Sequence, residues 1–281
     1  MTLVLRGTSQ QSFAVTRENL DRLVAGLDSA AITALSADLF TMVRTLDSSL
    51  ALRRGLTDPS RAANDKSELA NNLFGKTLGA NAIKVLNQML QLRWSSPRDL
   101  GDVLEVLAIE SEAAASEKDG SIDKLESEIF AFSETVSGAP DLRAALSNKT
   151  SAAGQASKSS VVNALLSGKA TTNTIRLISQ LIDHPRGRNI ESCFRDIANA
   201  VSSRRNRSIV HVASATELNS DQIARLTKAL EKEIGRKVQV NVAVDRSVVG
   251  GLSIRFGDEL IDGTVGSRLG SASRALAGKS A

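Results

Sequence analysis

Residues 70–77, with the sequence ANNLFGKT, come within one residue of a nucleotide-binding P-loop. That loop has the pattern GxxxxGK followed by Ser or Thr, and it cradles phosphates on backbone N–H groups. Ala70 stands where the pattern needs glycine, and a helical pattern precedes it where a P-loop needs a buried strand. Gly75 follows Leu73-Phe74, Gly168 follows Leu165-Leu166 after one serine, and a lysine comes next in both cases. We therefore predict that both glycines end helices.

Other residues of types that bind metals or catalyse reactions lack the spacing that such sites need. Asp258, Glu259 and Asp262 are close in sequence, but neighbouring residues of a tight hairpin point to opposite faces, so we interpret them as turn structure. His184 precedes a proline and His211 lies in a predicted strand, without the Cys or His spacing of a zinc site. The sequence thus predicts no catalytic residue, no metal site and no bound cofactor.

The glycines near the C-terminus have a structural pattern instead. Residues 250–263 read GGLSIRFGDELIDG, and a strand pattern precedes them. Apolar residues alternate with polar or small ones on both sides of the double glycine, at Val238, Val240, Val242 and Val244 and again at Leu252, Ile254 and Phe256. A period of two indicates strands with one covered face. Gly257-Asp258 between the last two strands is typical of a hairpin turn.

The order of these residues resembles the C-terminal signature of the delta subunit of bacterial ATP synthases, a relative of the mitochondrial oligomycin-sensitivity-conferring protein. The matching residues are Asp245, Gly250, Gly251, Gly257, Asp258, Asp262 and Gly263, with Arg268 and Arg274 in a closing basic helix. The resemblance implies a non-catalytic stator subunit that links the catalytic alpha/beta head to the peripheral stalk. Rotation is then coupled to ATP synthesis.

The same resemblance implies partners and a location. In the family, the helical domain holds the N-terminal segment of an alpha subunit, and the C-terminal domain meets the helices of the b-type stalk subunit. The expected location is the cytoplasmic face of the cell membrane, reached only through the complex. No nucleic acid is expected as a partner.

Most of the chain before these strands repeats itself. One helical stripe recurs with identical spacing, each residue 90 positions after its counterpart: Ile32, Leu35, Leu39, Met42 and Leu46 recur as Ile122, Leu125, Ile129, Phe132 and Val136. After a slip of two residues, Ile83 and Leu86 match Ile175 and Ile178. Helical periodicity alone would not make all the intervals alike, so we predict two copies of one antiparallel helical bundle.

The repeat gives the predicted domain organisation. Residues 1–98 form an extra helical domain, and residues 99–208 correspond to the usual helical domain of the family. The helix near 99–116 is shared by both copies. Residues 209–281 form a small β-α-β-β-β-α domain, so the fold class is mostly α with a C-terminal α+β domain. An added helical domain is typical of the actinobacterial branch of the family, and the chain resembles that enlarged form.

Composition excludes several classes of function. The 281 residues are 42% apolar, with a net charge of +4 and 3% aromatic residues. This apolar fraction supports packed cores, while so few aromatic residues provide little base stacking. No apolar run is long enough for a membrane span. Cys193, the one cysteine, is predicted to be buried. The alternative function is an RNA-binding protein that uses a basic C-terminal α+β domain.

For the alpha-subunit groove we predict the facing sides of the helices at 99–116 and 172–183. The candidate contact residues are Val103, Leu107, Ile175 and Ile178, and Arg176 is expected at the exposed edge. The other interpretation is that these apolar residues only fill the core of the bundle.

Overall fold

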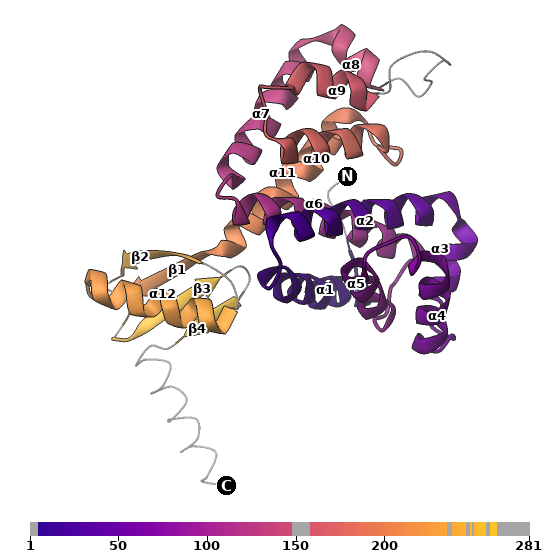
Figure 1. Cartoon of the computed structure of the whole chain (residues 1–281). Helices are drawn as coiled ribbons and strands as arrows, with labels where there is room; N and C mark the ends of the chain where they lie inside the picture. The colour runs from indigo at the N-terminus through magenta and orange to yellow at the C-terminus, as the bar shows by residue number, and fades with distance from the viewer. Residues whose placement is uncertain are drawn as a thin grey trace. The chain divides into compact units, whose positions relative to one another are not determined.

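The computed structural model places most of the chain (Figure 1). It describes residues 5–147, 158–234, 238–245, 248, 250–256 and 259–262. The chain divides between Ser202 and Ser203 into a helical unit and a C-terminal unit. The predicted fold class is confirmed at this level, because a mostly helical chain ends in a small sheet with a helix.

Eleven helices precede the sheet in the described residues, and the last of them, α11, runs from the helical unit into the C-terminal unit. They are α1 (Thr8–Ala25), α2 (Ser29–Ser48), α3 (Leu50–Thr57), α4 (Ala63–Phe74), α5 (Ala80–Leu90), α6 (Pro97–Lys118), α7 (Ile122–Gly138), α8 (Pro140–Ser147), α9 (Lys158–Leu166), α10 (Thr172–Asp183) and α11 (Ile190–Ser208). Figure 1 shows α6 between α1–α5 and α7–α10.

Helix α6 is the centre of this unit. It starts where Ser96 caps the backbone N–H of Arg98 and Pro97 occupies the first turn, a position that tolerates its missing N–H. Its apolar and small residues are buried on every side, and α1, α2, α3, α7 and α10 all pack against it. A helix buried all round is expected where two bundles share it.

The buried charges of α6 have partners on other helices. Arg17 of α1 donates two hydrogen bonds to Glu110, whose side chain has no exposed surface. Arg176 of α10 donates to Glu112 at 2.9 Å. Burial nevertheless raises the pKa of Glu112, against the opposing charge of Arg176.

The C-terminal unit is a four-stranded sheet with a helix in its described part. Its elements are β1 (Ile209–Ser214), α12 (Ser220–Ile234), β2 (Gln239–Val244), β3 (Leu252–Phe256) and β4 (Glu259–Asp262). The strand order is β2-β1-β3-β4, with β1 parallel to β2 and the other two pairs antiparallel. The β1-α12-β2 connection fits the rule that parallel neighbours need a crossover helix. Apolar residues of β1 and α12 form its core.

Short-range interactions shape the elements of this unit. Asn219 and Gln222 form a reciprocal capping box at the start of α12, with both bonds at 2.9 Å. Gly250 and Gly251 adopt φ angles of 69° and 84°, which side chains rarely allow. Strands β3 and β4 pair as a hairpin, with Phe256 opposite Glu259. The turn residues Gly257 and Asp258, with Gly263, Arg268, Arg274 and the closing helix, lie outside the described residues.

Candidate partner-binding site

The P-loop-like segment is a helix end. Helix α4 runs to Phe74 and is capped by Gly75, and no strand precedes it in the described chain. A Cβ on Gly75 would lie 2.5 Å from the carbonyl oxygen of Asn71, so this backbone leaves no room for a side chain. Gly168 follows α9 with a φ angle of 73°. Both predictions of glycine at a helix end are confirmed.

Cys193 and His184 lie in the helical unit. Cys193 is buried, as predicted, and burial raises the pKa of its thiol. His184 caps the C-terminus of α10, and burial together with the charge of Arg44 lowers its pKa. Within the described residues, no group of three or more His, Cys, Asp or Glu could hold a metal ion.

The four predicted groove residues are mostly in the core. Val103, Leu107 and Ile178 have no exposed surface, and Ile175 is half-buried. In this arrangement only Ile175 is accessible to a partner. The structure of one chain does not test partner binding, so their role stays a prediction.

Helix α2 covers the place where the sequence predicts the groove. The hydroxyl of Ser36 on α2 donates to the carbonyl of Ala108 on α6 at 2.8 Å. Arg44 on α2 donates to the side-chain oxygen of Gln180 on α10 at 2.7 Å. Part of the α6/α10 face is therefore in contact with α2.

Arg176 also differs from the expectation. Its side chain keeps 34% of its exposure, but its guanidinium binds Glu112, which is 1% exposed. Asn173, one turn earlier, donates to Ser116 of α6 at 2.8 Å. These residues hold α10 onto α6, so reversing the charge at Arg176 would disturb the fold as well as any partner contact.

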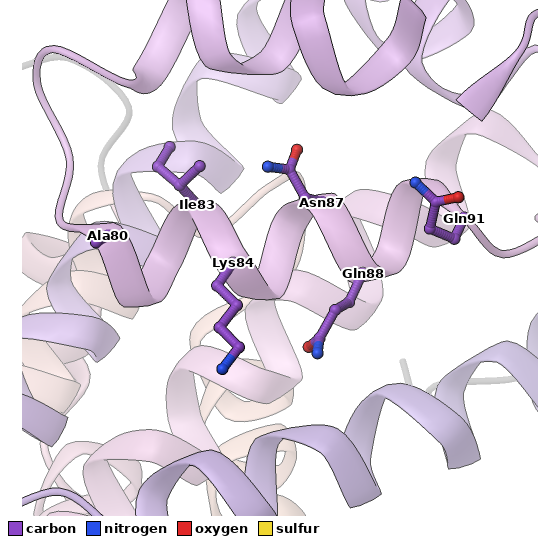
Figure 2. Close-up of a pocket in the computed structure, with 6 residues that line it drawn as sticks. All are labelled: Ala80, Ile83, Lys84, Asn87, Gln88 and Gln91. Carbon is purple, nitrogen blue, oxygen red and sulfur yellow. The ribbon is translucent and has the colours of Figure 1, made fainter. Parts of the chain in front are cut away.

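The predicted repeat points to the equivalent face of α5, which is open. With the same slip of two residues, Ile83 corresponds to Ile175 and Lys84 to Arg176. A cavity of about 460 Å³ lies along α5, lined by Ala80, Ile83, Lys84, Asn87, Gln88 and Gln91. Figure 2 shows Ile83 and Asn87 on one side of the helix and Lys84 and Gln88 on the other.

The polar residues of α5 are largely uncommitted. Asn87 donates to Asn71 of α4 at 3.1 Å. Lys84 and Gln88, in contrast, have no side-chain hydrogen bond or ion pair with the residues that the structure describes. Half-buried Ile83 adds an apolar element on the other side of the helix (Figure 2). This combination suits the apolar face of an amphipathic helix with polar contacts at its edges.

An ion network joins the two sides of the helical unit near the start of α11. Arg186 contacts Asp47 of α2 as well as Asp102 and Glu105 of α6, and Arg188 contacts Glu105 too. Burial opposes the charge of Arg186, but its hydrogen bond to Asp47 and the nearby carboxylates raise its pKa overall. Arg186 also has a φ angle of 53°, which is uncommon for a residue with a side chain.

Comparison with known proteins identifies the family. Residues 111–276 match the model of the ATP synthase delta (OSCP) subunit. A protein of Streptomyces avermitilis named ATP synthase subunit delta is 38% identical over 275 residues, covering 98% of this chain and 100% of the relative. The chain belongs to the ATP synthase delta (OSCP) family.

Other relatives of this delta-family chain extend over nearly its whole length. Proteins with the same name from Kineococcus radiotolerans and Thermobifida fusca are each 36% identical. The alignments cover 97% and 98% of this chain and 98% and 100% of the two relatives. The family model starts inside α6, yet these relatives share the residues before it. The chain is therefore the enlarged actinobacterial form that its repeat suggests.

The structure adds one finding on membranes. Among the helices that it describes, none is both long and apolar enough to cross a bilayer.

Proposed function

We propose that this chain is a non-catalytic stator subunit that joins the alpha/beta head of the ATP synthase to its peripheral stalk. Its membership in the delta (OSCP) family, with similarity over nearly the full chain, is the observation that carries the proposal. A stator subunit must resist torque without dissociating from its partners. Several linked contacts meet this need, because each bound site keeps the others at high effective concentration.

We also propose that the chain before the C-terminal sheet consists of two copies of one bundle, residues 1–98 and 99–208, joined through α6. Helices α2 to α6 contain 20, 8, 12, 11 and 22 residues, and α7 to α11 contain 17, 8, 9, 12 and 19. The matching order of long and short helices supports the repeat. A continuous, buried α6 would make a stiff link between the copies.

Within this scheme the alpha-subunit segment binds along α5 of the first copy. On the equivalent face of α10, Gln180 is bonded to Arg44 of α2, whereas the cavity along α5 is open. The bound segment would place apolar residues against Ile83 and polar ones beside Lys84 and Gln88. The predicted groove on α6 and α10 would then be a structural remnant of the duplication.

The C-terminal unit contacts the b-type helices of the peripheral stalk in this proposal. The final residues, including Arg268 and Arg274, supply the basic side of that contact, as the family resemblance implies. The complex would hold the chain at the cytoplasmic face of the cell membrane.

The proposal is tested by affinity purification of the tagged full-length chain from detergent-solubilised membranes. We expect the alpha and b-type subunits to co-purify. Recovery of RNA without either subunit, with binding that falls steeply as salt rises, would favour the RNA-binding alternative.

A second experiment locates the groove. A synthetic peptide of the alpha-subunit N-terminus is titrated into the full-length chain by calorimetry. Ile83→Glu should weaken binding by about tenfold or more, equal to about 1.4 kcal/mol. Lys124→Glu, an exposed change on α7, is the matched control and should leave binding unchanged. Unaltered affinity in a folded Ile83→Glu variant would place the groove elsewhere.

A further inference from the structure

A second cavity of about 460 Å³ lies between α3 and the start of α6, apart from the open face of α5. Four arginines line it: Arg53, Arg54, Arg98 and Arg186. Asp47 is the carboxylate among its lining residues, and Leu50 contributes an apolar side chain that is 51% exposed. The cavity therefore has a surplus of positive charge beside an exposed apolar residue.

Two of these arginines are already used inside the protein. Arg186 is 9% exposed and binds three carboxylates. Arg53 binds Asp47 at 3.1 Å. Their charges are largely compensated, so they shape the floor of the cavity.

The other two arginines remain available to a ligand. Arg54 is exposed and makes no ion pair or hydrogen bond with the described residues. Arg98 is 60% exposed and lies 3.5 Å from Asp102, which Arg186 already binds at 2.8 Å. Guanidinium groups at the mouth of a cavity favour carboxylates, which they bind through paired hydrogen bonds.

The start of α6 does not offer the backbone donors that a compact anion would use. Pro97 has no N–H, and the N–H groups of Arg98 and Asp99 are bonded to Ser96. A phosphate site at a helix N-terminus depends on such free donors. Recognition here falls to side chains, and exposed Leu50 adds an apolar contact.

We propose that this cavity binds an acidic segment of a partner protein, with its carboxylates on Arg54 and Arg98 and an apolar side chain against Leu50. The predicted repeat aligns Leu50 with Pro140 and Arg54 with Ala144, so the second copy lacks both features. Arg54, Arg98 and Leu50 thus belong to the added part of the chain. The cavity is separate from the proposed alpha-subunit groove and supplies a further contact of opposite chemistry.

The test uses the full-length chain and a capped hexapeptide of sequence EELEEL, with QQLQQL as the uncharged comparison. Binding is measured by calorimetry and by the fluorescence of Trp94, the one tryptophan of a chain without tyrosine. Trp94 lies two residues before Ser96 of the cavity lining. We expect EELEEL to bind, QQLQQL not to bind, and affinity to fall with salt because the contacts are exposed charges.

The double variant Arg54→Ala/Arg98→Ala should weaken EELEEL binding by about tenfold or more. The matched control Arg22→Ala/Lys124→Ala removes the same charge from exposed positions elsewhere and should leave it unchanged. Equal weakening in both double variants, equal binding of both peptides, or displacement of EELEEL by inorganic phosphate would overturn the proposal. Binding of the alpha-subunit peptide should be unaffected by Arg54→Ala/Arg98→Ala, which separates this site from the groove on α5.

Discussion

Helices α5 and α10 hold equivalent places in the proposed repeat, yet they use their polar side chains differently. On α10, Asn173, Arg176 and Gln180 all bond to neighbouring helices. Their counterparts Asn81, Lys84 and Gln88 on α5 make no such bond with the described residues. The same surface pattern thus serves internal packing in one copy and remains open in the other.

The difference has a simple origin in the order of the copies. Helix α10 lies beside α6, and α6 is covered by α2 of the first copy. Helix α5 lies beside α1 and α4 and also contacts α2, yet the cavity along it is lined by its own residues and Gln91. The shared helix α6 thus brings Arg44 of the first copy to Gln180 of α10.

The largest expected loss of stability comes from breaking the ion network of Arg186, which joins α2 to α6. Arg186→Ala removes the cation that Asp47, Asp102 and Glu105 share, and Glu105, which is 6% exposed, then keeps only Arg188. Removing one partner of a buried ion pair costs about 3–5 kcal/mol in the free energy of unfolding. Urea denaturation measures this loss. Arg22→Ala, which breaks an exposed pair with Glu18, should cost at most about 1 kcal/mol.

The next comparison removes one cation from each equivalent helix. Arg176→Ala leaves the buried carboxylate of Glu112 without its ion-pair partner and should cost about 3 kcal/mol in unfolding free energy. Lys84→Ala should change it by less than about 0.5 kcal/mol, because Lys84 is exposed and unpaired in the described structure. Equal costs for the two variants would contradict the assignment of α10 as closed and α5 as open.

Sequence patterns predicted the parts of this fold that depend on residues close together in the sequence. The alternating valines gave the strand at Gln239–Val244, and the alternation after the double glycine gave the strand at Leu252–Phe256. The span predicted at 172–183 is the helix that the structure contains. Each of these signals acts over a few residues, where backbone geometry and the side chains alone decide the outcome.

The sequence did not foresee which groove is open. Apolar periodicity marks Val103 and Leu107 as residues to be covered, but it cannot distinguish α2 from a partner chain as the cover. The contact of Arg186 with Asp47 joins residues 139 positions apart and leaves no local signal. The repeat itself held the missing clue, because it maps Ile175 onto Ile83 at the open face.

The pH dependence of stability sharpens the comparison on the closed side. Burial raises the pKa of Glu112 above its ordinary value of 4.5, so the folded chain holds this proton more tightly than the unfolded chain. Glu112 therefore lowers the free energy of unfolding least at low pH. This loss of stability grows as pH rises above 4.5, until the carboxyl of the folded chain ionises. Relative to the unaltered chain, Glu112→Gln should gain stability as pH rises over this interval. Urea midpoints that differ by the same amount at all pH values would contradict the raised pKa.

The smallest effect concerns the hydrogen bond that carries α2 onto α10. Gln180→Ala removes the acceptor of Arg44 and should cost about 1 kcal/mol, because a net intramolecular hydrogen bond contributes about that much. Gln88→Ala on α5 removes the same side chain without a bond to break and should cost less than about 0.5 kcal/mol. In the double variant Arg44→Ala/Gln180→Ala, the loss should be smaller than the sum of the two single losses, because both single changes break the same bond. Strict additivity would mean that α2 covers the groove by packing alone, and the bond between these side chains would then have no part in closing it.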